Sequence, residues 1–174
     1  MNARQRAEVK AQAHGCCEYC WSQEEYSPDP FSVEHIIPLS RGGNDDLDNL
    51  AFACQGCNNR KYVNTQAIDL SSGELASLFH PRQDHWSAHF VWNDDYTLMI
   101  GVSATGRATV ARLDLNRKGL VNLRRVLRAQ GLHPQHAMTE RHRMLKYDQP
   151  FESVAEEDWD VLRPMSPVGR SGGR

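Results

Sequence analysis

The stretch FSVEHIIPLSRGG, residues 31–43, combines a strand pattern with two side chains that packing does not explain. Its aromatic and β-branched residues predict a short strand, and Pro38 predicts the end of that strand because proline cannot donate a hydrogen bond to a sheet. Glu34 and His35 stand next to each other inside it, an acid and a base among apolar neighbours. The loop that follows carries Arg41 and two glycines. Charged residues are rarely buried without a partner, so this pair indicates a chemical role.

Two pairs of cysteines with the same spacing flank the strand. Cys17 and Cys20 enclose two residues, Cys54 and Cys57 enclose two more, and 33 residues separate the pairs. Two thiolates with this spacing can bind one ion from a single turn, so the two pairs predict a tetrahedral zinc site. Four thiolates leave no coordination position open, and the predicted zinc is therefore structural. Cys16 remains an alternative partner for Cys20, although the two-residue spacing favours Cys17.

The composition predicts a soluble, cytoplasmic protein with no membrane segment. Hydrophobic residues make up 40% of the chain and the formal net charge is −2. No run approaches the ~18 apolar residues of a membrane span, and the first residues are too polar for a signal peptide. Charge is nevertheless uneven: residues 112–147 hold nine Lys or Arg and two acids, whereas residues 148–162 hold six acids and no base. The basic segment could face a phosphate backbone or form solvated helix faces.

Local patterns predict the other elements. The polar, Ala-rich residues 3–13 favour a helix, LAFAC at 50–54 favours a second short strand, and a short helix is expected after the second cysteine pair. Beyond residue 64 we expect two strands on either side of the turn Asn93-Asp94-Asp95, and a third possible strand in RATVARLDL at 107–115.

An amphipathic helix is expected at residues 119–130, ended by Gly131. Four apolar residues share one face of this helix, and its arginines, Arg124 among them, are expected mostly off that face. The apolar residues are Leu120, Leu123, Val126 and Leu127. This face would dock onto the part of the chain that holds the cysteine pairs, and the arginines could face DNA.

The sequence VEHIIPLSRGG…LDNLAFACQGCNNRK, within residues 16–61, resembles the HNH endonucleases of the ββα-metal class, in the branch with a four-cysteine zinc site. The three positions that give the family its name fall on His35, Asn49 and Asn58. The stretch WSAHFVWNDDYTLMIGVSATGRATVARLDLNR resembles an extension found on some bacterial HNH proteins, with no activity implied.

The resemblance implies that His35 is the general base that activates water and that Asn49 orients its ring. It also implies that Glu34 and Asn58 hold the catalytic metal, and their hard oxygen ligands suit Mg²⁺ or Mn²⁺. Many family members have Asp in place of Glu34. Adjacent strand residues normally face opposite sides, so Glu34 and His35 share a site only if the strand twists or ends there.

Other roles for these residues remain open from the sequence. Asn49 could be a turn or cap residue, and Asn58 could cap the short helix. Arg41 and Lys61 lie near the site in sequence, and we expect both to hold flanking phosphates.

The predicted architecture is α+β: a ββα-metal HNH nuclease module with structural zinc knuckles, extended by a β-hairpin and a helix. We expect an N-terminal helix at 1–13, the module at 14–64, the extension at 65–147, and an acidic segment with a disordered tail at 148–174.

The predicted reaction is metal-dependent hydrolysis of DNA phosphodiester bonds. A non-catalytic zinc-stabilised nucleic-acid-binding module is the main alternative, and a zinc module that binds proteins is another. RNA is not excluded as a substrate, and the sequence leaves the oligomeric state open.

Overall fold

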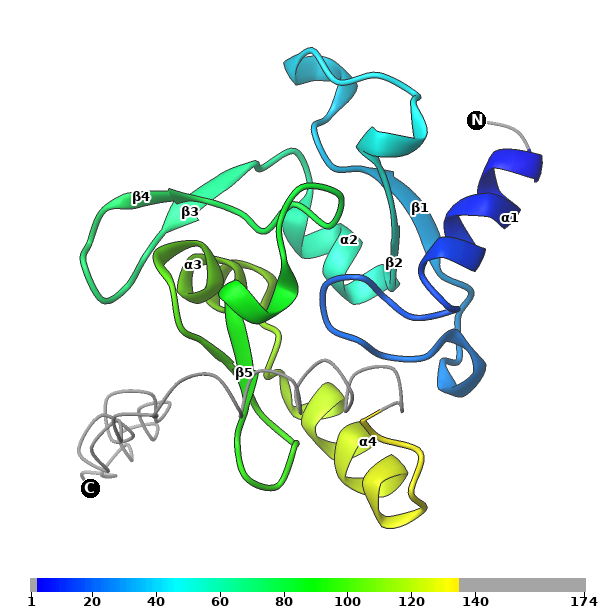
Figure 1. Ribbon diagram of the computed structural model, residues 1–174, viewed down its shortest axis with the longest axis vertical. Helices are drawn as coiled ribbons and strands as arrows, with labels where there is room; N and C mark the ends of the chain where they lie inside the picture. Colours follow the sequence, from blue (N-terminus) through cyan, green and yellow to red (C-terminus); the bar gives the residue numbers. More distant parts are fainter. Residues whose placement is uncertain (1–2, 135–174) are drawn as a thin grey trace, which may run out of the picture.

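The structure is a computed structural model, described here for residues 3–134 (Figure 1). The predicted acidic segment and disordered tail at 148–174 lie outside these residues, as does the basic segment beyond residue 134. The predicted N-terminal helix is present as α1 (Ala3–Gln12). It contacts both strands of the hairpin that follows, and Val9 is its buried residue.

The quoted stretch forms β1 (Ser32–His35), which pairs antiparallel with β2 (Leu50–Ala53). Every residue of β2 is buried, as its run of apolar residues predicts. A helix, α2 (Gln55–Lys61), follows at once and contacts β1, so the hairpin lies between α1 and α2 (Figure 1). Two strands and the two helices α1 and α2 thus give this region the mixed content of the predicted α+β class.

Four short 3₁₀ helices interrupt the connections: η1 (Glu24–Tyr26), η2 (Leu39–Arg41), η3 (Leu47–Asn49) and η4 (Trp86–Ala88). The elements η2 and η3 both lie in the loop between β1 and β2. Gly43 allows this loop to fold back, because a Cβ atom there would stand 1.8 Å from the carbonyl oxygen of Ile37. The loop consequently returns the chain to β2 beside the end of β1.

The extension holds more structure than the sequence indicated. The predicted hairpin is present as β5 (Phe90–Trp92) and β6 (Met99–Gly101), and the predicted helix as α4 (Lys118–Ala129). A further hairpin, β3 (Gln66–Ile68) with β4 (Leu75–Ser77), was not predicted. Its strands are short and alternate between exposed and half-buried residues, so they carry no strong apolar period.

The strand expected at 107–115 was wrong: most of these residues belong to a helix, α3 (Ala104–Leu113). Ser103 caps it, because its hydroxyl accepts a hydrogen bond from the backbone N–H of Gly106 at 3.0 Å. Thr109 and Val110 suggested a strand, but the cap and the neighbouring alanines favour a helix. The helix α3 contacts α2 and both hairpins of the extension.

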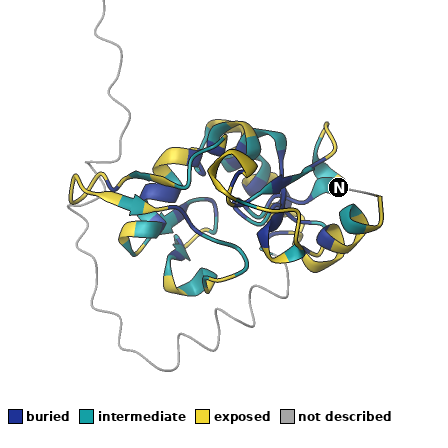
Figure 2. Ribbon diagram, turned by 90° about the horizontal axis from the view of Figure 1, so that it is seen from above, coloured by how far each residue is buried: buried dark blue, intermediate teal, exposed yellow. Residues whose placement is uncertain are grey.

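One cluster of buried apolar residues extends through the HNH-like region and the extension. Phe31 and Phe52 belong to it, and so do Phe90, Met99 and Leu113. Figure 2 shows buried segments running through the middle of the molecule, with exposed segments at loops and outer helix turns. The extension therefore packs onto the core that also supports the β1–β2 hairpin.

The face predicted for α4 needs one correction. Leu120 and Leu127 are buried as expected, but Val126 is 62% exposed and Arg124 is buried. The guanidinium of Arg124 donates to the carbonyl oxygens of Thr97 and Cys20 and lies over the Trp92 ring, 4.8 Å from its centroid. Arg124 thus joins the extension to the first cysteine turn and is not available to DNA.

Candidate functional site

The four predicted zinc ligands meet in one cluster. The sulfur atoms of Cys17, Cys20, Cys54 and Cys57 all lie within 4.8 Å of one another, and those of Cys20 and Cys54 are 3.7 Å apart. Zinc–sulfur bonds of ~2.3 Å in a tetrahedron require sulfur atoms ~3.8 Å apart, so the donor set fits Zn²⁺. Cys16 lies outside the cluster and forms an isolated bridge with Gln23, which decides the alternative in favour of Cys17.

Local geometry explains how the second pair binds from one turn. Cys54 is the N-cap of α2, and its sulfur atom accepts a hydrogen bond from the backbone N–H of Cys57. The zinc site therefore fixes the start of α2, and α2 in turn carries Asn58 and Lys61. A closed four-thiolate site has no position for substrate, so chemistry has to occur elsewhere.

A groove of about 400 Å³ opens between the end of β1 and α2. His35 and Asn58, the first and third of the namesake residues, both line it, although they are distant in the sequence. The loop after Pro38 forms another wall, with Leu39 exposed on it. Arg41 is also exposed, at the end of η2.

His35 is held by an acid that sequence reasoning missed. Its Nε2 atom lies 2.8 Å from Oδ1 of Asp45, which belongs to the loop between the strands. The hydrogen bond from His35 lowers the pKa of Asp45 below its ordinary value. The carboxylate therefore accepts from Nε2–H, and Nδ1 is left as the unprotonated nitrogen of the neutral ring.

Asn49 does not contact the ring of His35. It is buried, and its side-chain amide accepts a hydrogen bond from the N–H of Ile37 at 2.8 Å. The same amide donates to the carbonyl oxygens of Ile37 and Asn44, each at 2.9 Å. Asn49 therefore holds the loop in place. Its backbone carbonyl also accepts from the N–H of Ile36, the residue after His35, at 2.9 Å. The loop that Asn49 holds also carries Asp45.

Glu34 points away from His35 and into the protein, as strand alternation requires. It is 6% exposed and accepts hydrogen bonds from the hydroxyl of Tyr19 and from Nζ of Lys61, the latter at 2.8 Å. Burial raises the pKa of Glu34, although Lys61 and Tyr19 favour its charged form. Glu34 nevertheless lines the groove together with His35 and Asn58.

Lys61 occupies the interior and not the surface. It is 1% exposed, and its ammonium also donates to the carbonyl oxygen of His35 at 2.9 Å. Its ammonium is therefore not at the surface, and the contact with a flanking phosphate stays a prediction. The ion pair with Glu34 ties α2 to β1 and so fixes the distance across the groove.

Comparison with known proteins gives matches to the region that holds the four cysteines and the groove. Residues 17–63 match the family model described as HNH endonuclease. Residues 17–63 are an HNH domain. A similar protein is the type IV methyl-directed restriction enzyme EcoKMcrA of Escherichia coli (strain K12), 32% identical over 69 residues. That alignment covers 37% of this chain and 25% of the relative, so the chain spans about a quarter of that enzyme's length.

Mutation of the buried ion pair between Lys61 and Glu34 should destabilise the protein more than mutation of an exposed ion pair. Lys61→Met should lower the free energy of unfolding by about 3–5 kcal/mol, because it leaves the Glu34 carboxylate buried without its cation. Urea denaturation in zinc-saturated buffer measures the change. Arg60→Met is the matched control: Arg60 pairs with Asp114 at the surface, at 3.5 Å, and its loss should cost less than about 1 kcal/mol.

The double variant Glu34→Gln/Lys61→Met distinguishes the pair from the packing of the lysine stem. If the pair accounts for the loss, removing the second charge recovers much of the stability. Equal losses from Lys61→Met and Arg60→Met, or no recovery in the double variant, would contradict the role given to the pair.

Arg117, a residue of the extension, contacts the predicted zinc site. The guanidinium lies 3.3 Å from the sulfur atom of Cys54 and 3.7 Å from that of Cys57. A Cβ atom on Gly56 would stand 2.5 Å from Nη2 of Arg117, so a side chain there would displace the guanidinium. The cation offsets part of the negative charge of four thiolates, and it links the HNH domain to the segment before α4.

Tyr62 ends α2 in an unusual conformation. Its φ is +50° and its ψ −132°, a region that residues with a Cβ atom adopt only at a cost of order 1–3 kcal/mol. The residue is 71% exposed, so burial of its ring does not offset that cost. It lines the same groove as His35 and Asn58.

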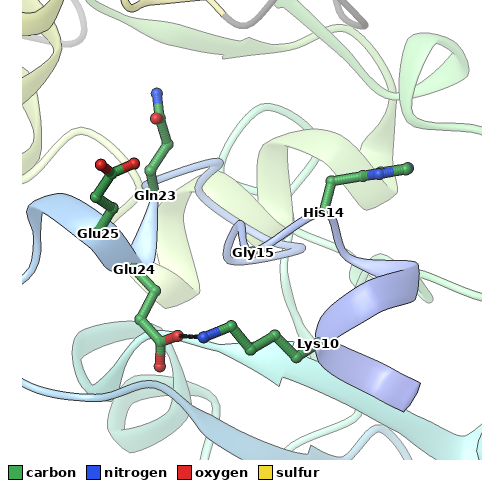
Figure 3. A pocket seen from close by; sticks show the side chains of 6 residues that line it. All are labelled: Lys10, His14, Gly15, Gln23, Glu24 and Glu25. Atoms are coloured by element: carbon green, nitrogen blue, oxygen red, sulfur yellow. Dashed lines mark ion pairs between the residues drawn. The ribbon is translucent and has the colours of Figure 1, made fainter. Parts of the chain in front are cut away.

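A second hollow, of about 380 Å³, shares no lining residue with the groove of the HNH domain. It lies beside α1 and η1, where Lys10 and Glu24 form an ion pair (Figure 3). It is separate from the groove and does not extend the candidate site. Within residues 3–134 no helix is long and apolar enough to cross a bilayer.

Proposed function

We propose that this chain hydrolyses DNA phosphodiester bonds in a reaction that depends on a divalent metal, with the groove of the HNH domain as the active site. The observation that supports this most strongly is the meeting of His35 and Asn58 on one groove, with His35 held by Asp45. DNA as the substrate is supported by the family and by the restriction-enzyme relative.

His35 is the proposed general base. Its side chain is 28% exposed, so water can reach the ring. Nδ1 takes the proton from that water while Asp45 keeps the proton on Nε2 and stabilises the imidazolium that forms. Asn49 holds the loop that supplies Asp45 and acts as a positioning residue. Arg41 is the proposed contact for a flanking phosphate, through its exposed guanidinium.

Asn58 and Glu34 are the proposed ligands of Mg²⁺ or Mn²⁺, since both residues line the groove and both side chains carry hard oxygen atoms. The bound cation would neutralise charge that develops on the phosphate. Lys61 and Tyr19 donate hydrogen bonds to the Glu34 carboxylate and so hold it in position behind the groove. The four thiolates would hold the structural zinc, which keeps α2 and therefore Asn58 in place.

Asn58→Ala tests the metal site. The variant should need at least ~10-fold more Mg²⁺ for half-maximal cleavage of plasmid DNA, because loss of even an outer-shell partner costs a metal site ~10–100-fold. Asn59→Ala is the control, since Asn59 is the exposed next residue of α2. An unchanged Mg²⁺ requirement in Asn58→Ala, with zinc content intact, would exclude Asn58 as a ligand.

A further inference from the structure

We propose that Tyr62 is a stacking platform for an unpaired nucleobase of the DNA strand being cut, so that the favoured substrate has unpaired bases at the cleavage site. This inference rests on the proposed function, because it places a nucleotide beside the phosphate at His35. Tyr62 and Leu39 line the same groove as His35 and Asn58.

The turn after α2 sets the backbone of Tyr62 but does not call for a tyrosine: the N–H of Asn64 donates to the carbonyl oxygen of Lys61 at 3.0 Å, and such a turn favours glycine at its first central position. A glycine would adopt φ +50° with ψ −132° freely, yet the chain has a tyrosine there. The ring is in water, 71% exposed, and so contributes little to the core. Strain of this kind persists where function needs the side chain in one place.

Neighbouring contacts fix the position of the ring relative to the chemistry. The N–H of Tyr62 donates to the carbonyl oxygen of Asn58 at 2.9 Å, so the two residues lie one helical turn apart. The preceding Lys61 is buried and bound to Glu34 and to the carbonyl oxygen of His35. The backbone of Tyr62 therefore directly follows a residue that joins α2 to β1.

The exposed surface suits a nucleobase better than a phosphate. Tyr62 offers an exposed aromatic ring, and Leu39, another residue of the groove, is apolar and 56% exposed. Bases in a duplex already stack on each other, whereas an unpaired base has a free face for an aromatic ring. Stacking of this type tolerates any base, so it selects strand structure and not sequence.

Binding of DNA by three variants tests the inference. The full chain in a His35→Ala background, which leaves DNA uncut, is titrated into a fluorescein-labelled single strand and into its duplex in Mg²⁺. Tyr62→Gly should bind the single strand about ten-fold more weakly, whereas its affinity for the duplex changes little. Tyr62→Phe keeps the ring and should retain the preference for the single strand.

Thermal unfolding supplies the second readout. Tyr62→Gly should raise Tm by about 2–6 °C because it removes the strain. Leu70→Gly is the control: Leu70 is 73% exposed, lies outside the groove and has no positive φ. It should lower Tm slightly and leave both affinities unchanged. A stability gain together with a loss of single-strand binding would identify a residue retained for function at a cost in stability.

Equal weakening on single strand and duplex, or no weakening on either, would overturn the inference. Photo-cross-linking of a single strand that carries 5-iodouracil tests it without a variant at Tyr62: attachment at Tyr62 supports the platform, and attachment only elsewhere overturns it. These outcomes are independent of cleavage. A protein that binds as expected but cuts nothing would contradict the proposed reaction and leave the stacking site standing.

Discussion

His35→Ala is expected to lower the rate of DNA cleavage by about 10²–10⁴-fold, the usual contribution of a general base. The ring of His35 is at the groove surface, and its side-chain hydrogen bond is with the exposed Asp45. Its removal therefore leaves no buried polar group without a partner. Zinc content and Tm should remain close to those of the wild type.

Single-turnover cleavage of supercoiled plasmid measures this effect, with zinc quantified in every preparation. His85→Ala is the control, because His85 is exposed and lies outside the groove. Asp45→Asn should fall between wild type and His35→Ala, since the amide no longer stabilises the imidazolium. Undiminished cutting by purified His35→Ala would remove His35 from the mechanism.

Loss of one zinc ligand is expected to unfold the HNH domain. Cys20→Ser should abolish tight zinc binding. Apparent free energies of zinc binding are roughly 10–16 kcal/mol, which is as large as the net stability of a typical domain, about 5–15 kcal/mol. The zinc site joins the turn before Trp21 to the start of α2, beside the hydrogen bonds between Glu18 and Phe52. The variant should lose its near-UV circular dichroism and its cooperative thermal transition.

Cys16→Ser is a close control for this experiment. Cys16 is buried, only 2% exposed, and neighbours a ligand, but its sulfur atom is outside the four-cysteine cluster. This variant should keep about one zinc per chain and a cooperative transition. A folded Cys20→Ser protein without zinc would show that the apolar core suffices, and the zinc would then have a role other than folding.

The sequence predicted the parts of the site that depend on short spacings. The two cysteine pairs and the run from Val33 to Pro38 are local patterns, and the structure brings the cysteines together as expected. The hairpin around residues 93–95 and the helix at 119–130 also carry strong local signals. A glycine after that helix, Gly131 with φ +71°, ends it as predicted.

Contacts between distant residues could not be predicted in the same way. Lys61 meets Glu34 across 27 residues, from the last residue of the helix that Cys54 caps. Asp45 carries no motif, and only the return of the loop after Gly43 places it beside His35. Charge on α4 likewise suggested a DNA-facing arginine, whereas packing against Trp92 buries Arg124.

The most direct test of the central claim is nicking of supercoiled plasmid by zinc-loaded wild-type protein in Mg²⁺, in Mn²⁺ and in EDTA added just before the substrate. We expect relaxed circles in Mg²⁺ or Mn²⁺ and none in EDTA, with one tightly held zinc per chain. Salt-sensitive DNA binding without cleavage in any metal would contradict the account, and would identify the chain as a zinc-stabilised binding module.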